Sequence, residues 1–305
     1  MTGRGGDGDD GPWRTRGRPP RREPFRPRRN DQARETAPTR PAAARPDRRD
    51  EVRLYGMNAV QAVFSRRPQA IRKLYLTGPR VPDLQPLLKW CVANRVGYRV
   101  VHEEAELGRL AGSGRHEGVV AEVLREPVPA LEAWLPGLAA GPQCLLWLDG
   151  VGNPHNFGAI LRSAAHFGAA AVLLPEDSGL ALSGAAARVA EGGAEAVPLV
   201  RMGPQAGAIG LLREAGFGLA ATVVDGGDDL FAAALPERLV YVMGAEGGGM
   251  DRTLADACDL RLSIPGTGDV ESLNVAAATA VFLAAWRRSY SAGALPKSPS
   301  ASAAR

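Results

Sequence analysis

The sequence predicts an α/β protein in which a mostly parallel sheet is preceded by a smaller α/β domain. From Gln143 onward, short apolar stretches alternate with segments of helical spacing, the pattern that builds a parallel sheet with helices on both faces. A shorter series of strand and helix patterns occupies residues 51–125. The chain has 305 residues, of which 45% are hydrophobic, so two ordinary domains with sizeable cores are expected.

Residues 1–49 are expected to form a disordered, basic tail. They contain eight Pro and six Gly but no Leu, Ile or Val, so they cannot bury enough apolar surface to offset the entropy cost of ordering. Their 14 Arg outnumber 7 acidic residues and give this segment a net charge of +7, whereas the rest of the chain carries −3. Such an arm can neutralise RNA phosphates or simply keep the protein in solution, and the sequence leaves open whether it is required.

Residues 51–125 are expected to form the smaller domain, and residues 126–142 a linker rich in proline. Asn58 is a suitable N-cap for the first helix of this domain. The remaining elements follow from apolar alternation or helical spacing. They are strands at 71–76, 97–101 and 119–124 and helices at 84–95 and 103–110.

Residues 143–290 are expected to form the larger domain, and residues 291–305, which are small and polar, a frayed end. The predicted strands are 144–148, 170–174, 197–200, 218–224, 239–243 and 260–264, and the predicted helices are 156–167, 185–191, 206–215 and 272–288. Asn156 is expected to cap the first of these helices, and Glu271 or Ser272 the last.

Cysteine usage and hydropathy restrict the cellular compartment that is expected for the protein. The three cysteines, Cys91, Cys144 and Cys258, form no CxxC pair, and the four histidines lack metal-ligand spacing, so neither a disulfide framework nor a metal site is expected. No apolar run reaches the roughly 18–20 residues that span a bilayer. The N-terminus has no apolar segment behind its charges and does not fit a secretory signal. We therefore expect a cytoplasmic protein with no membrane association.

Candidate site residues lie in three segments that follow predicted strands of the larger domain, where open α/β sheets bind ligands. The segments are 153–164, which contains Asn156 and Arg162; 243–250, which contains Glu246; and 264–276, which contains Ser272 and Asn274. Taken singly, they also fit a surface arginine, a flexible turn and an ordinary serine cap. A plain turn rarely needs the four glycines around Glu246, however, and Asn is a poor residue inside a helix.

Together and in this order, the three segments resemble the motifs of the SPOUT superfamily of methyltransferases, specifically its SpoU (TrmH-like) branch. The resemblance covers Gln143 to about Tyr290. The smaller domain resembles the L30e-like substrate-binding domain that often precedes this catalytic domain, through residues 55–60 (YGMNAV) and 115–120 (RHEGVV). The resemblance implies a C-terminal trefoil knot, S-adenosylmethionine as cofactor and a homodimer with its site at the subunit interface. It further implies methyl transfer to a ribose 2′-hydroxyl in tRNA or rRNA.

The resemblance also implies catalytic roles. Arg162 matches the arginine that activates the ribose hydroxyl. Because a guanidinium keeps its proton in proteins, we expect Arg162 to orient the hydroxyl and stabilise a developing alkoxide. Asn156 and Glu246 match residues that position this arginine and shape the pocket. Ser272 and Asn274 match the third motif, which contacts the arginine, the substrate or the cofactor carboxylate.

Cofactor binding is likewise implied by the match. Backbone groups of Gly244, Ile264 and Leu273 are expected to hold S-adenosylmethionine, with Thr222 and Met243 nearby. The methyl donor is itself an electrophile, so the enzyme mainly has to align donor and acceptor, and no metal is needed.

Two positions depart from the family pattern. Gly266 stands where Met often follows Ile-Pro, and Glu117 stands where Gln is common beside His116. Glu117 is expected to add a negative charge near bound RNA, which bears on the preferred substrate more than on activity. The roles of His116, Glu117 and His155 stay open at this point, as does the identity of the RNA and of the modified nucleotide.

Two other functions fit parts of the sequence. A Rossmann-type methyltransferase is suggested by residues 148–152 (LDGVG), but Asn153-Pro154 follows in place of a glycine run, and residues 244–249 do not match GxGxxG. A non-catalytic RNA-binding protein would need only the tail and the smaller domain. In that case one or more candidate catalytic residues should be missing. All five are present, namely Asn156, Arg162, Glu246, Ser272 and Asn274.

Overall fold

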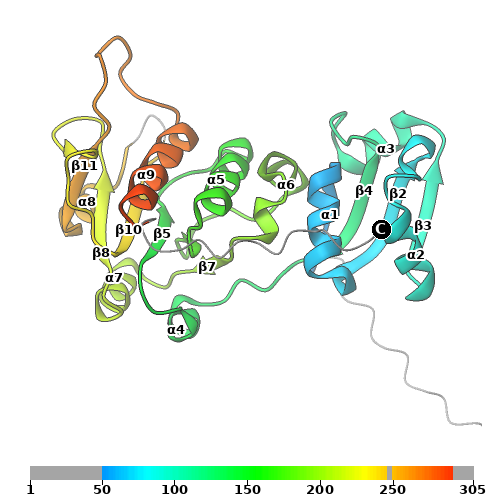
Figure 1. Ribbon diagram of the computed structural model, residues 1–305, viewed down its shortest axis with the longest axis horizontal. Coiled ribbons are helices and arrows are strands. Elements are labelled where there is room, and N and C mark those ends of the chain that lie inside the picture. Colours follow the sequence, from blue (N-terminus) through cyan, green and yellow to red (C-terminus); the bar gives the residue numbers. More distant parts are fainter. Residues whose placement is uncertain (1–49, 246–248, 291–305) are drawn as a thin grey trace, which may run out of the picture. The chain divides into compact units, whose positions relative to one another are not determined.

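The computed structural model describes residues 50–245 and 249–290, which form two β-sheets with flanking helices (Figure 1). The small sheet has the strand order β1-β4-β2-β3, and the large sheet has the order β7-β6-β5-β10-β8-β11-β9. The expected disordered tail at 1–49, the expected frayed end at 291–305 and the candidate residue Glu246 lie outside the described residues.

The small sheet combines antiparallel and parallel pairing. Strand β4 pairs antiparallel with β1 and β2, and β2 pairs parallel with β3. Apolar residues of α1 and α2 pack on one face, and Leu107 of α3 packs on the other with Tyr55 and Tyr75. The elements are β1 (Glu51–Tyr55), α1 (Met57–Arg66), η2 (Pro68–Ala70), β2 (Ile71–Thr77), η3 (Gly78–Arg80), α2 (Gln85–Ala93), β3 (Gly97–Val101), α3 (Glu104–Ala111) and β4 (Val119–Leu124).

The large sheet is parallel in every strand pair of the described residues, which confirms the predicted α/β class with a mostly parallel sheet. Its elements begin with α4 (Leu131–Trp134), η4 (Leu135–Gly137), β5 (Gln143–Leu148), α5 (Pro154–Phe167), β6 (Ala171–Leu174), α6 (Gly184–Ala190), η5 (Gly193–Glu195) and β7 (Leu199–Arg201). They continue with α7 (Gln205–Glu214), β8 (Gly218–Thr222), β9 (Asp228–Asp229), β10 (Arg238–Met243), α8 (Arg252–Ala257), β11 (Leu260–Ser263) and α9 (Val275–Tyr290).

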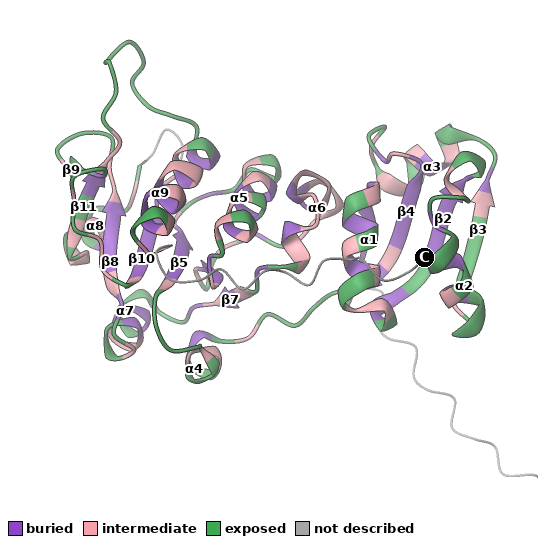
Figure 2. Ribbon diagram, viewed as in Figure 1, coloured by how far each residue is buried: buried purple, intermediate pink, exposed green. Residues whose placement is uncertain are grey.

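Helices cover both faces of the large sheet, so the inner residues of its central strands β5, β8 and β10 are buried (Figure 2). Alternate residues of β5 show this directly. Leu146 and Leu148 join the core beneath α5, α6 and α9, whereas Leu145 and Trp147 join the core beneath α4, α7 and α8. A parallel sheet buried on both faces reads as a continuous apolar run, which is why these strands were predictable.

The strand order departs from the Rossmann arrangement. In a Rossmann fold the fourth strand along the chain lies beside the first. Here the fourth strand of the large sheet is β8, and β10 separates it from the first strand, β5. The Rossmann-type alternative is therefore wrong. The last strand, β11, lies beyond β8, yet the helix that follows it packs against α5. Residues 264–274 consequently cross back over the carboxyl edge of the sheet.

Three helices begin at positions that differ from the expectation. Helix α1 starts at Met57, after Gly56, so Asn58 lies within its first turn and does not cap it. Helix α5 starts at Pro154, and its cap is Asn153, whose Oδ1 accepts a hydrogen bond from His155 N at 2.8 Å. Asn156 therefore lies within the first turn and does not cap it. Proline fits the first helical position because the missing N–H has no partner there.

Helix α9 starts at Val275 rather than at Ser272. The Oδ1 of Asn274 accepts a hydrogen bond from Ala276 N at 2.9 Å, which is the geometry of an N-cap. Neither Glu271 nor Ser272 fills this position, so that expectation was wrong, and Asn274 is not a helix-interior residue. The linker also contains a short helix, α4, that the sequence patterns did not predict. No helix within 50–245 and 249–290 is long and apolar enough to cross a membrane.

Helices α5 and α6 approach closely at Gly158. A Cβ at this position would lie 2.5 Å from Ala186 O and 2.8 Å from the Val189 side chain. We therefore expect Gly158→Ala to lower the free energy of unfolding by about 1–3 kcal/mol through overpacking. Urea denaturation followed by circular dichroism measures this change.

Gly210→Ala is the matched control, because Gly210 lies inside α7 and a Cβ there meets no atom within 4 Å. It should raise the free energy of unfolding by about 0.5–1 kcal/mol, since glycine is the weaker helix former. A destabilisation of similar size in both variants would contradict the assigned α5–α6 contact.

Candidate active site

The candidate cofactor residues gather at one edge of the large sheet. Thr222 ends β8, Met243 ends β10, and Ile264 directly follows β11. These three parallel strands are neighbours in the sheet, so their carboxyl ends meet at the same edge. Thr222 Oγ1 donates a hydrogen bond to Val242 O at 2.8 Å and ties two of the strand ends together.

The loops that leave this edge pack backbone against backbone. A Cβ on Gly244 would lie 2.9 Å from Gly249 C and 2.9 Å from Met250 N. Ala245 and Gly249 exchange two backbone hydrogen bonds, of 3.0 and 3.1 Å, which close the loop after β10. Gly244 therefore serves close approach of two backbone segments and not only flexibility.

The loop after β5 packs against the same region. Gly150 has a φ of +75°, and a Cβ there would lie 2.9 Å from Ala245 Cβ. Asp149 Oδ2 accepts a hydrogen bond from Asp251 N at 3.1 Å. Sequence reasoning did not assign Asp149 and Gly150 to this site. The Asp-Gly pair directly after a buried strand was the available signal.

A side-chain hydrogen bond joins the first and third segments. Asn274 Nδ2 donates to Asn156 Oδ1 at 3.1 Å, linking the first turn of α5 to the start of α9. Between them lies a hollow of about 190 Å³ lined by residues 150–153, Asn156 and Val275. This volume is below the roughly 300–1,000 Å³ of sites that enclose a whole ligand, and it suits a group the size of one sugar.

Arg162 and Ser272 are not part of this cluster. Arg162 lies six residues after Asn156, about 9 Å further along the helix at 1.5 Å per residue. Both side chains are exposed, and within 50–245 and 249–290 neither forms a hydrogen bond or ion pair. The structure thus brings together Asn156 and Asn274 of the candidate catalytic residues, and leaves Arg162 pointing to solvent.

The thiols of Cys144 and Cys258 and the phenol of Tyr241, which do not lie at this edge, offer no nucleophile to the site. Burial raises the pKa of the Cys144 thiol and of the Tyr241 phenol. Burial, with a smaller contribution from Asp259, raises the pKa of Cys258 to about 11. These groups stay protonated at neutral pH, and a thiol in that form is unreactive.

The surface of the edge suits an uncharged or cationic ligand with apolar faces. Val224, Val270 and Leu273 are exposed by 53%, 71% and 48%, on the loops that follow β8 and β11. The three loops, 223–227, 244–250 and 264–274, contain no Lys or Arg, so they lack the cations that usually hold phosphates. S-adenosylmethionine, which has a purine ring, a sulfonium and no phosphate, fits this lining.

The motif residues of the small domain have structural partners. His116 is buried, and its Nδ1 accepts a hydrogen bond from Gly118 N at 3.1 Å, which holds the turn before β4. Glu117 does not present a free negative charge, because Arg188 lies 2.6 Å from its carboxylate and Met57 N donates to it at 2.9 Å. That expectation was wrong. His155 is exposed in the first turn of α5.

Comparisons with known proteins identify the class. The profile "RNA 2′-O ribose methyltransferase substrate binding" matches residues 53–127, and the profile of the "SpoU rRNA Methylase family" matches residues 143–284. The chain is 37% identical to the uncharacterized tRNA/rRNA methyltransferase YfiF of Escherichia coli O157:H7 over 92% of its own length and 80% of that protein. It is 36% identical to the 23S rRNA (guanosine-2′-O-)-methyltransferase RlmB of Nitrosomonas europaea, over 75% and 88% of the two chains.

Solved structures agree on the fold. The SpoU methyltransferase AviRb from Streptomyces viridochromogenes, in complex with AdoMet, superposes with a TM-score of 0.67 at 22% identity over 81% of this chain and 93% of that one. An AdoMet-bound rRNA methyltransferase from Sinorhizobium meliloti gives 0.66 at 23% identity over 79% and 88%. Fold, edge and relatives together define an S-adenosylmethionine-dependent RNA 2′-O-methyltransferase. The chain belongs to the SpoU rRNA methylase family.

The close backbone contact at Gly244 predicts a binding defect. Gly244→Ala must displace the loop that contains Gly249, so we expect the Kd for S-adenosylmethionine to rise about tenfold, equivalent to about 1.4 kcal/mol. Isothermal titration calorimetry measures it. Gly207→Ala is the control, since Gly207 lies on α7 with no atom within 4 Å of an added Cβ. An unchanged Kd in Gly244→Ala would show that the loop after β10 is not part of the cofactor site.

Proposed function

We propose that this chain methylates a ribose 2′-hydroxyl of tRNA or rRNA with Arg162 as the residue that acts on the hydroxyl. The observation that carries the proposal is the convergence of three loops at one sheet edge, tied together by the Asn156–Asn274 hydrogen bond. This edge offers a cofactor surface without phosphate-binding cations and a sugar-sized hollow beside it.

The names of relatives indicate which RNA to test first. Several relatives at 36–37% identity are named as methyltransferases of a guanosine ribose in 23S rRNA. The relative matched over 92% of this chain has a name that spans tRNA and rRNA. A guanosine in 23S rRNA is accordingly the first candidate, with tRNA as the second.

When bound, S-adenosylmethionine supplies a methyl group made electrophilic by its positively charged sulfur. The residues of the chain provide alignment and charge stabilisation. Arg162 donates hydrogen bonds to the ribose O2′ and stabilises the negative charge that develops there. Because the guanidinium keeps its own proton, the hydroxyl proton passes to another acceptor, for which a phosphate oxygen of the RNA is suitable.

The remaining roles follow the placement of each residue. Asn156 and Asn274 hold α5 and α9 in register at the hollow. Ser272 and Glu246 complete the substrate side, Ser272 from the exposed segment before α9. The cofactor is held by backbone groups of Gly244, Ile264 and Leu273, beside Thr222 and Met243. The location of these five at neighbouring strand ends and in the segment that follows β11 supports this assignment.

A second copy of the chain is proposed to complete the site. Arg162 is exposed, lies about 9 Å from Asn156 along α5, and is not among the residues that line the hollow. An apolar depression of about 370 Å³ on α9 supplies a surface for a partner. It is lined by Phe231, Ala280, Val281, Ala284, Ala285 and Arg288. A homodimer that buries this depression would bring Arg162 to the edge of the partner subunit.

Other features belong to the same proposal. The return of residues 264–274 over the sheet edge supports a C-terminal trefoil knot, and the mixed small sheet supports an L30e-like domain. We assign residues 51–125 to RNA binding, 126–142 to the linker and 143–290 to catalysis, in agreement with the two matched profiles. The free thiols of the three cysteines support a cytoplasmic setting. The basic charge of segment 1–49 supports a role for it in RNA binding.

Replacement of Arg162 tests the catalytic role. We expect Arg162→Ala to lower the rate of methyl transfer at least about a hundredfold, as loss of a transition-state donor does, with the Kd for S-adenosylmethionine unchanged. The rate is measured with labelled cofactor and 23S rRNA. Arg213→Ala, at an exposed ion pair with Asp259 on α7, should transfer at the wild-type rate. Full activity in Arg162→Ala would refute the assignment.

Replacement of Ala284 tests the dimer. A guanidinium introduced by Ala284→Arg would be buried beside the like charge of Arg288, four residues further along α9, which is costly at an apolar interface. We expect the wild-type chain to run as a dimer in sedimentation velocity, and the variant as a monomer with greatly reduced activity. A monomeric wild-type chain with full activity would contradict the shared site.

A further inference from the structure

A partly buried ion pair joins the small-sheet region to the segment that contacts the backbone of Arg162. Arg67, directly after α1, donates to Glu195 of η5 through Nε at 2.6 Å and through Nη2 at 2.7 Å. The two side chains are only 13% and 4% exposed. Arg67 Nη1 also donates to Leu124 O at 2.6 Å, so the guanidinium is fixed from both sides.

The ion pair between Arg67 and Glu195 is better explained by the relative position that it fixes than by a gain in folding free energy. Removing two charges from water costs about as much as their attraction returns, whereas a two-pronged guanidinium–carboxylate contact fixes distance and orientation. The contact therefore sets where η5 lies relative to α1 and β4.

The other side of η5 touches the backbone of the catalytic helix. A Cβ on Gly193 would lie 2.7 Å from Leu161 O, 3.0 Å from Arg162 Cα and 3.1 Å from Arg162 N. No flexible side chain lies between the two backbones at this point. A shift of η5 must therefore displace α5 at Arg162.

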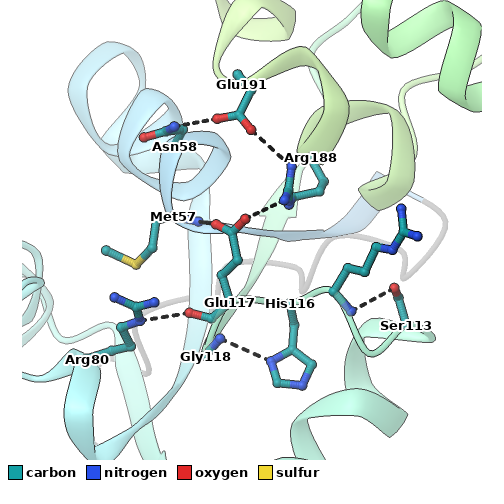
Figure 3. A network of polar contacts seen from close by, with 10 residues as sticks. Met57, Asn58, Arg80, Ser113, His116, Glu117, Gly118, Arg188 and Glu191 are labelled. Atoms are coloured by element: carbon teal, nitrogen blue, oxygen red, sulfur yellow. Dashed lines mark hydrogen bonds and ion pairs between the residues drawn. The ribbon is translucent and has the colours of Figure 1, made fainter.

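A second group of contacts holds the residues just before η5 (Figure 3). Asn58 Nδ2 donates to the carboxylate of Glu191, which also pairs with Arg188 at 3.0 Å. Arg188 in turn pairs with Glu117 at 2.6 Å. Gly192 is close to α1 as well, because a Cβ there would lie 3.2 Å from Ala62 Cβ. Residues 191–195 are thus held by the small-sheet region on one side and by α5 on the other.

We propose that Glu195 and Arg67 are positioning residues for methyl transfer, which place Arg162 relative to RNA held by the small-sheet region. This inference rests on the proposed function. The RNA-binding part of the chain would thereby set the location of the arginine that acts on the bound ribose. RNA bound without this contact would be held but poorly aligned.

The test uses the full chain, labelled S-adenosylmethionine and transcribed 23S rRNA. Glu195→Gln keeps the shape of the side chain but removes the charge that Arg67 contacts at 2.6 Å, and leaves the longer pair of Arg67 with Glu126 at 3.9 Å. Because a misplacement of about 1 Å can cost about a hundredfold in rate, we expect kcat to fall at least about tenfold. KM for RNA and the Kd for the cofactor should stay within about twofold of wild type, since the binding surfaces are intact. Arg67→Lys, which keeps the charge and loses the two-pronged contact, should show a smaller fall of about threefold.

Glu106→Gln is the matched control. It removes an exposed pair with Arg99 at 2.9 Å in the same small-sheet region, and it should leave kcat unchanged. A wild-type kcat in Glu195→Gln, or a raised KM with kcat unchanged, would overturn the inference. If Glu195→Gln unfolds below the assay temperature, Arg67→Lys is judged instead, and a wild-type kcat in that variant overturns the inference equally.

Amide hydrogen exchange separates this inference from the proposed function. Exchange at Leu161 and Arg162 should be faster in Glu195→Gln and unchanged in Glu106→Gln. Unchanged exchange in Glu195→Gln would overturn the positioning role whatever the activity. Faster exchange in a chain that methylates no RNA would support the coupling and refute the proposed function alone.

Discussion

The return of the chain from β11 to α5 is the constraint on which the rest of the structure depends. Strand β11 lies beyond β8, yet α9 packs against α5 on the other side of β10. The apolar face of α9 enforces this path, because Phe282, Leu283 and Trp286 are buried in the core that α5 shares. Each such side chain contributes roughly 1.5–3 kcal/mol when buried. The crossing segment, residues 264–274, therefore has to run over the carboxyl edge of the sheet.

The candidate active site is a consequence of that crossing. It brings a third loop to an edge where the loops after β5 and β10 already meet, and it ends at Asn274, which caps α9 and bonds to Asn156. Close approach leaves room only for glycine at Gly150 and Gly244. The edge thus presents backbone groups and a few exposed apolar side chains, a surface matched to a cofactor without phosphates. Methyl transfer then needs one well-placed positive charge, which we propose is that of Arg162.

Sequence patterns predicted the large sheet because its strands are buried on both faces and read as apolar runs. They failed where two residues close in the sequence could each serve as the N-cap of one helix. Asn153 and Asn156 are both good caps, and Pro154 decided between them. Asn274 was expected inside a helix and instead begins it. The environment of Glu117 was out of reach, since its partner Arg188 lies 71 positions away and pairs with it only in the folded chain. The three-segment pattern nevertheless located the sheet edge, because loops at the ends of neighbouring parallel strands must meet.

The small-sheet region contacts the rest of the chain through α6 and through the segment that follows it. Residues 191–195 contact α1 through side chains and α5 through backbone, so the part of the chain matched to substrate binding and the arginine assigned to catalysis share a common support. An RNA enzyme of this design needs its binding region for alignment as well as for affinity.

The most direct test of the central claim is to identify the methylated product. The purified chain would be incubated with labelled S-adenosylmethionine and total RNA from a host that lacks its gene, and the RNA digested to nucleosides for mass analysis. The expected product is a labelled 2′-O-methylated nucleoside in tRNA or rRNA. Label found only on a base, or no transfer to any RNA, would contradict it.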